Sequence, residues 1–279
     1  VSVFFFMLLS GYVLANFVDK NKFSKSKLIQ WRLIRLGLVY YAVLGASYLI
    51  LPNEVSKTDK SIFLTHLYLL KEETIFNGIN PPLWSLSVEI MLSVIFMGFS
   101  RSFMMAHDKV LYASAIGFLI ICYAYDDWNY KAISRSIFFF ISGLILYKKQ
   151  PHIRFRVSKT ISILFLIVNI GLLDFNRGVG YLLLPISLPL LFILLIGNEE
   201  YWRNKKSLIF VGKISFSLYV THWVILKSLE RLGVFSSTSH SFELTLSILV
   251  CFIFAVAFFL MFDNWVQKLS RIILFNDRA

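Results

Sequence analysis

A succession of long apolar runs, separated by short charged loops, restricts this chain to very few folds. A helix of about 20 mostly apolar residues spans the hydrocarbon core of a bilayer, and a shorter run fits by tilting or thinning the bilayer. Of the 279 residues, 57% are hydrophobic and only 16% are charged, whereas a soluble domain carries about 25% charged residues. We therefore expect an all-α, polytopic integral membrane helix bundle of nine spans. The spans are predicted at about Val1 to Val18, Leu33 to Leu51, Leu83 to Phe99, Val110 to Tyr125, Ile133 to Tyr147, Ile161 to Leu173, Tyr181 to Ile196, Ser207 to Leu226 and Leu244 to Trp265.

The basic residues of the loops predict how the bundle is oriented. If the nine spans alternate, most of the 28 Lys and Arg residues fall on the side of the loop from Asp19 to Arg35. Loops rich in Lys and Arg stay in the cytoplasm, so this side and the C-terminus are predicted to be cytoplasmic. The protein is thus expected in the lipid bilayer of the cytoplasmic (inner) membrane. A nucleic-acid partner is not expected, because the basic residues are scattered over separate loops.

The chain opens in the middle of an apolar run and does not begin with Met. We expect an N-terminal truncation that removes one transmembrane helix, which brings the total to ten. Residues 1–279 are then expected to form a single, N-terminally truncated transmembrane domain.

An acidic residue inside an apolar run is the first candidate for chemistry. Pro81 and Pro82 end a polar loop and predict a helix that begins near Leu83, since proline is tolerated in the first helical turn. Glu89 lies about 9 Å along that helix, within the predicted hydrocarbon region. A charge near the bilayer centre costs at least about 2.5–3.5 kcal/mol and usually has a partner or a function. Ser85, four residues earlier, shares its helix face and predicts a polar stripe that faces protein or water.

Two arginines stand at the predicted cytoplasmic start of the second span. Arg32 and Arg35 are three residues apart and are expected to share a helix face. Paired guanidinium groups can bind phosphate oxygens through bidentate hydrogen bonds. The alternative is that both arginines only anchor the span at the cytoplasmic surface.

The eighth predicted span carries polar side chains at helical spacing. Lys213 lies near its cytoplasmic end, and Ser215, Tyr219 and His222 follow along one face. His222 is expected at a depth similar to that of Glu89. A histidine with an ordinary pKa of about 6.5 can carry protons, but it can equally make one hydrogen bond between helices.

Other sequence features point to packing rather than to chemistry. Cys122 and Cys251 fall in apolar runs and are expected to be buried side chains, not a disulfide or a metal site. The pairs Ser10-Gly11 and Ser142-Gly143 predict close helix packing. The motifs of zincins, of hydrolase nucleophile elbows and of P-loops are absent from the sequence. We expect no metal and no bound cofactor.

Four of these stretches together resemble the membrane acyltransferase 3 family. Val3 to Tyr12 resembles its FFxLSGF motif, and Arg32 to Arg35 resembles its RxxR motif. Trp84 to Glu89 is similar to WSLSVE, and Gly212 to Trp223 is similar to GxxSYSLYLxHW. The motifs keep their order and spacing over most of the chain. The resemblance implies about ten transmembrane helices and an enzyme that transfers an acyl group, commonly acetyl. The donor would be cytoplasmic acyl-CoA, as a substrate, and the acceptor a hydroxyl of an extracytoplasmic glycan.

The resemblance also implies roles for individual residues. Arg32 and Arg35 would bind CoA phosphates, and Glu89 with Ser85 would order the catalytic cavity. The remaining candidates would line or support this cavity: His222, with Glu89, in a supporting catalytic role, and Lys213, Ser215 and Tyr219, with Ser85, in substrate binding. In the family, the catalytic His, preceded by an Arg, lies in a helix upstream of the first motif. The main catalytic His is therefore expected upstream of Val1.

Two other classes of protein stay open. A transporter or flippase of small molecules or lipid-linked sugars also buries a carboxylate, a histidine and aromatic rings among many helices. Inverted repeats would favour a transporter, and the sequence has none that we detect. The second alternative is a non-catalytic relative that only binds a glycan or a partner. Acyl transfer by the full-length protein separates an enzyme from both alternatives.

Overall fold

The computed structural model describes residues 2–20, 23–51, 80–124, 128–149, 177–197, 204–234 and 240–275, together with four positions between 160 and 168. Within these residues all regular secondary structure is helical, which confirms the all-α fold class. The predicted span from Ile161 to Leu173 falls largely outside the described residues.

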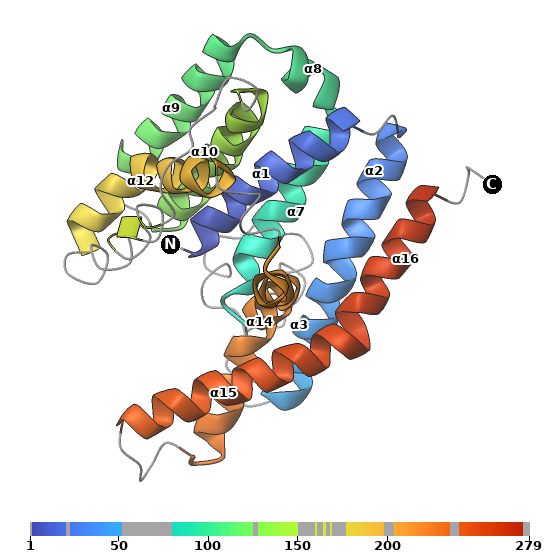
Figure 1. Cartoon of the computed structure of the whole chain (residues 1–279), viewed down its shortest axis with the longest axis vertical. Helices are drawn as coiled ribbons and strands as arrows, with labels where there is room; N and C mark the ends of the chain where they lie inside the picture. Colours follow the sequence, from blue (N-terminus) through green and yellow to red (C-terminus); the bar gives the residue numbers. More distant parts are fainter. Residues whose placement is uncertain are drawn as a thin grey trace. The chain divides into compact units, whose positions relative to one another are not determined.

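The chain forms two compact units, each of which gathers segments from distant parts of the sequence (Figure 1). The first unit consists of Val1–Lys22 and Ile95–Lys206, and the second of Phe23–Val94 and Ser207–Ala279. The predicted single domain over residues 1–279 stays a prediction. The first unit contains α1 (Ser2–Lys20), α8 (Ser100–Met105), α9 (Asp108–Ala124), α10 (Trp128–Lys149) and α12 (Arg177–Gly197). The second contains α2 (Lys25–Arg32), η1 (Leu33–Gly37), α3 (Leu38–Ile50), α14 (Lys206–Arg231), α15 (His240–Phe258), η3 (Phe259–Asp263), α16 (Asn264–Phe275) and α7 (Leu83–Gly98) up to Val94.

Among the described residues, four helical stretches are long and apolar enough to cross a membrane. They are Val3–Lys20, Lys25–Ile50, Lys206–Arg231 and Phe242–Phe275, and two shorter apolar helices cover Leu83–Gly98 and Leu183–Gly197. The spans predicted from Val110 and from Ile133 coincide with α9 and α10. Eight of the nine predicted spans thus coincide with helices, while the number of membrane crossings stays a prediction.

Two helical stretches of the second unit extend far beyond their predicted spans. The second span is predicted to begin at Leu33, yet the helix begins at Lys25, after Ser24. The Ser24 side chain caps this end by accepting a hydrogen bond from the backbone N–H of Lys27. The last span is predicted to end at Trp265, yet its helix continues to Phe275.

Packing between α2 and α16 explains why these extensions are helical. The two helices contact each other along their lengths (Figure 1). α16 buries Val266, Ser270 and Leu274, which recur every four residues and therefore share one face. The remaining residues of α16 are partly or fully exposed, and several of them are polar, so no continuous apolar run predicts this helix. Helices outside an apolar run form here because one face packs against a neighbour.

The core of the second unit joins helices that are distant in sequence. Val39, Tyr40 and Val43 of α3 pack with Leu83 and Leu86 of α7. The same cluster contains residues from α14 and α16: Val220, Val224 and Val266. This packing fixes α3, α7 and α14 around the polar side chains described below.

The first unit depends on a close approach between α1 and α10. A Cβ atom at Gly11 would overlap the backbone carbonyl oxygen of Phe140, and one at Gly143 would overlap the carbonyl oxygen of Leu8. The predicted close packing at both glycines is therefore confirmed. Phe4 stacks on Phe139 beside this crossing, with ring centroids 5.4 Å apart.

Replacing either crossing glycine with alanine should separate α1 from α10. Because the added methyl group would meet backbone, which cannot rotate away, we expect Gly143→Ala to lower the free energy of unfolding by about 1–3 kcal/mol. Gly117→Ala in α9 is the control, since a Cβ atom added there would have nothing within 4 Å, and alanine favours helix by up to about 1 kcal/mol. Thermal unfolding of the purified protein in detergent measures both. Equal stability of the two variants would contradict the close approach.

Candidate active site

One face of α7 carries three buried polar side chains. Ser85, Glu89 and Ser93 recur every four residues, and all three are buried. The helix begins at Leu83, as the two prolines predict, and Leu83 N donates to Asn80 O over 3.0 Å. The predicted polar stripe is therefore present, and it faces protein.

Arg32 pairs with this stripe from the end of α2. Its Nη2 donates to Glu89 Oε1 in an ion pair, and its Nε donates to Ser93 Oγ over 3.1 Å. The Arg32 side chain is 12% exposed and that of Glu89 is 2% exposed. Two residues singled out from the sequence for separate reasons thus form one buried ion pair.

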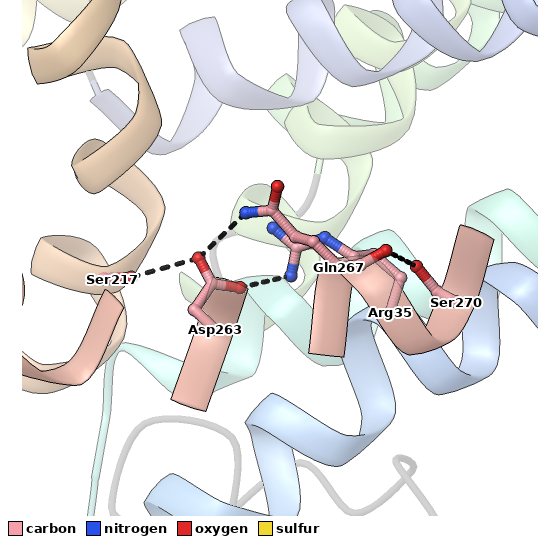
Figure 2. A network of polar contacts seen from close by, with 5 residues as sticks. All are labelled: Arg35, Ser217, Asp263, Gln267 and Ser270. Atoms are coloured by element: carbon pink, nitrogen blue, oxygen red, sulfur yellow. Dashed lines mark hydrogen bonds and ion pairs between the residues drawn. The ribbon is translucent and has the colours of Figure 1, made fainter. Parts of the chain in front are cut away.

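Arg35 forms a second ion pair, with a carboxylate that the sequence patterns did not single out. Its Nη1 donates to Asp263 Oδ1 over 2.6 Å (Figure 2). Asp263 Oδ2 accepts hydrogen bonds from Ser217 Oγ over 3.1 Å and from Gln267 Nε2 over 3.3 Å. The Asp263 side chain is fully buried, and the guanidinium of Arg35 also lies over the ring of Phe216, 4.9 Å from its centroid.

Both residues of the second ion pair lie in short π-helical turns. Arg35 belongs to η1, and Asp263 is the last residue of η3. Single π turns inside α-helices occur frequently at functional sites. The α16 helix contacts both turns, which brings Arg35 and Asp263 face to face.

The two ion pairs form one electrostatic cluster, which we call the Arg–acid cluster (Arg32, Arg35, Glu89 and Asp263). Arg35 lies within electrostatic range of Arg32 and Glu89 as well as Asp263. Two guanidinium groups and two carboxylates give the cluster no formal net charge. Each guanidinium has five N–H donors, and Arg35 is 17% exposed. The cluster can therefore hold both arginines in place and still present donors to an anionic ligand.

A second polar group lies at the N-terminal end of α7. Tyr219 Oη is 2.5 Å from Ser85 Oγ, and it donates to the backbone oxygen of Pro82 over 2.8 Å. The contact joins α14 to the stripe on α7, one turn from Glu89. The structure thus unites Tyr219 and Ser85, which belong to different sequence motifs.

The other candidates of α14 lie in different surroundings. His222 is partly buried, and its Nδ1 is 2.6 Å from the backbone oxygen of Tyr219 in the preceding turn. Its ring lies beside that of Tyr219, with centroids 5.9 Å apart. Lys213 and Ser215 are exposed, and Ser215 Oγ donates to the backbone oxygen of Gly212. The structure does not bring Lys213 and Ser215 to the Arg–acid cluster.

The buried ion pair of Arg32 should be far more important for stability than an exposed pair on the same unit. Glu89→Gln leaves a largely buried guanidinium without a counter-charge, so we expect the free energy of unfolding to fall by up to about 3–5 kcal/mol. Glu230→Gln is the matched control, because Glu230 pairs with Lys227 at the surface of α14, where such pairs contribute at most about 1 kcal/mol. Denaturant unfolding in mixed micelles compares the two. A loss for Glu89→Gln no larger than that for the control would show that this ion pair is not formed.

Comparison with known proteins gives one functional result. The family model described as an acyltransferase domain, that of the acyltransferase 3 family, matches residues 1–263. The matched part includes the whole Arg–acid cluster together with Ser85 and Tyr219. Neither the curated proteins nor the solved structures yield a match. Since the family model covers most of the chain, this chain belongs to the membrane acyltransferase 3 family and is a membrane acyltransferase.

Proposed function

We propose that the protein transfers an acyl group, commonly acetyl, from cytoplasmic acyl-CoA to a hydroxyl of an extracytoplasmic glycan. The observation that carries this proposal is the Arg–acid cluster, which holds two guanidinium groups inside an apolar helix bundle. An arginine inside a membrane protein is energetically costly and usually serves a substrate or an ion. In an acyltransferase, the substrate that most needs positive charge is a CoA thioester, because it carries several phosphate groups.

The donor site is proposed at Arg32 and Arg35. Both belong to the helix that follows the basic loop from Asp19, which is the loop that the positive-inside rule assigns to the cytoplasm. Acyl-CoA is made and kept on that side of the membrane. The N–H groups of the Arg35 guanidinium that do not contact Asp263 would bind phosphate oxygens, and Arg32 would add its positive charge beside them. With this orientation the C-terminus is cytoplasmic, and the protein belongs to the cytoplasmic membrane.

The acceptor would approach from the opposite end of α7. Ser85 and Tyr219 form a hydroxyl pair there, one helical turn beyond Glu89. In the transfer, the acceptor oxygen attacks the thioester carbonyl carbon, the carbon–sulfur bond breaks, and CoA leaves as its thiol. A base takes the proton of the acceptor hydroxyl as the new ester forms. Glu89 and His222 are proposed to support this step, and Ser85 and Tyr219 to orient the acceptor.

Loss of one proposed phosphate ligand should weaken the use of the donor. We expect Arg35→Ala to raise the KM for acetyl-CoA about tenfold or more, the factor that corresponds to one charge-assisted hydrogen bond. The measurement is incorporation of label from radiolabelled acetyl-CoA into the glycan of washed membranes, using the protein expressed from its complete coding sequence. Arg101→Ala is the control, because Arg101 is an exposed arginine of α8.

The same experiment separates the alternatives. A transporter or a non-catalytic relative would incorporate no label above membranes that lack the protein. If Arg35→Ala incorporates label with an unchanged KM for acetyl-CoA, the protein is an acyltransferase but Arg35 is not part of its donor site.

A further inference from the structure

Asp263 is a buried carboxylate to which the proposed reaction assigns no role. It lies at the end of η3, within the last apolar helical stretch, and it has no exposed surface. Three side chains donate hydrogen bonds to it: Arg35, Ser217 and Gln267 (Figure 2). These donors come from three different helical segments, namely η1, α14 and α16.

Stability alone is a weak reason for such a group. A buried ion pair gains little over well-packed apolar side chains, because removing both charges from water offsets their attraction. The backbone gives a second reason to expect a function, because Arg35 and Asp263 each lie in a π-helical turn. Both features are typical of a site where the placement of a side chain matters more than the stability of the fold.

The contacts of Arg35 show what Asp263 can control. Asp263 accepts a hydrogen bond from Nη1 of the guanidinium, and the guanidinium carbon lies over the ring of Phe216, 4.9 Å from its centroid. One charge-assisted hydrogen bond and one cation–π contact together restrict the position of the group. An arginine fixed in this way loses less side-chain entropy when its other N–H groups bind an anion.

We propose that Asp263 is a positioning residue for the acyl donor, acting through Arg35. Ser217 and Gln267 hold the second oxygen of Asp263, so the carboxylate itself has a fixed orientation. This inference rests on the proposed function, because it takes Arg35 as a ligand of the CoA phosphates.

Positioning and simple electrostatics predict opposite effects of removing the negative charge. Asp263→Asn makes the cluster more positive by one charge. If Asp263 only lowered the local positive potential, the variant would bind a polyanionic donor more tightly. If Asp263 positions Arg35, the variant binds the donor more weakly, because a neutral amide oxygen holds the guanidinium less firmly than a carboxylate does.

The experiment measures the KM for acetyl-CoA and kcat in the membrane assay described above. We expect Asp263→Asn to raise the KM about tenfold, as for the loss of one charge-assisted hydrogen bond, and to change kcat by less than about twofold. Ser270→Ala is the control: Ser270 is equally buried on α16 but donates to the backbone oxygen of Gln267. Its KM should equal that of the wild type.

A double-mutant cycle tests whether Asp263 acts through Arg35. If it does, Arg35→Ala combined with Asp263→Asn should raise the KM no further than Arg35→Ala alone. The inference is overturned if the effects of the two substitutions on the KM are additive. It is also overturned if Asp263→Asn alone leaves the KM unchanged or lowers it. If Asp263→Asn does not accumulate in the membrane, Asp263→Glu is the second variant to measure. It keeps the negative charge but moves the carboxylate by one methylene, and Arg35 with it. If Asp263 positions Arg35, this variant also raises the KM for acetyl-CoA, and an unchanged KM would overturn the inference.

The dissociation constant of CoA for the purified protein distinguishes the two proposals. If Arg35→Ala weakens CoA binding while Asp263→Asn leaves it unchanged, the inference fails and the donor site stands. If Arg35→Ala leaves CoA binding unchanged, the donor site itself is wrongly assigned.

Discussion

The structure of the second unit depends on the compensation of charge inside an apolar bundle. Two guanidinium groups lie among largely apolar helices, and each is paired with a buried carboxylate from another helix. Arg32 ties α2 to α7, and Arg35 ties η1 to η3. A charge buried without a partner would cost several kcal/mol, so these helices must keep their mutual register. The ion pairs thus determine which faces of the helices meet, while the apolar core supplies most of the attraction.

This arrangement places polar side chains along a line through the second unit. Ser93, Glu89 and Ser85 follow one another on α7, and Tyr219 joins the line at its end. An acyltransferase that uses a donor on one side of a membrane and an acceptor on the other needs such a polar path. The three residues of this line on α7 are buried, so their hydrogen bonds are stronger than they would be at a surface.

Most of the fold and part of the site could be predicted from the sequence. Apolar runs predict helices well, and Glu89 was found because a carboxylate within such a run is conspicuous. Asp263 also lies within a predicted span, but it stands two residues from the end of that span, at Trp265, where a carboxylate is less conspicuous. The pairing of Arg32 with Glu89 depends on tertiary contacts that no local pattern encodes. The extent of α16 depends in the same way on its packing against α2.

Binding of the acyl donor by the Arg–acid cluster is the proposal on which the roles of all these residues rest. A structure of the complete protein with CoA bound would test it without any intermediate assumption. We expect phosphate oxygens within hydrogen-bond distance of the Arg35 guanidinium, with Asp263 still bound to its Nη1. Phosphate groups bound elsewhere, with Arg32 and Arg35 contacting only protein, would contradict the proposal.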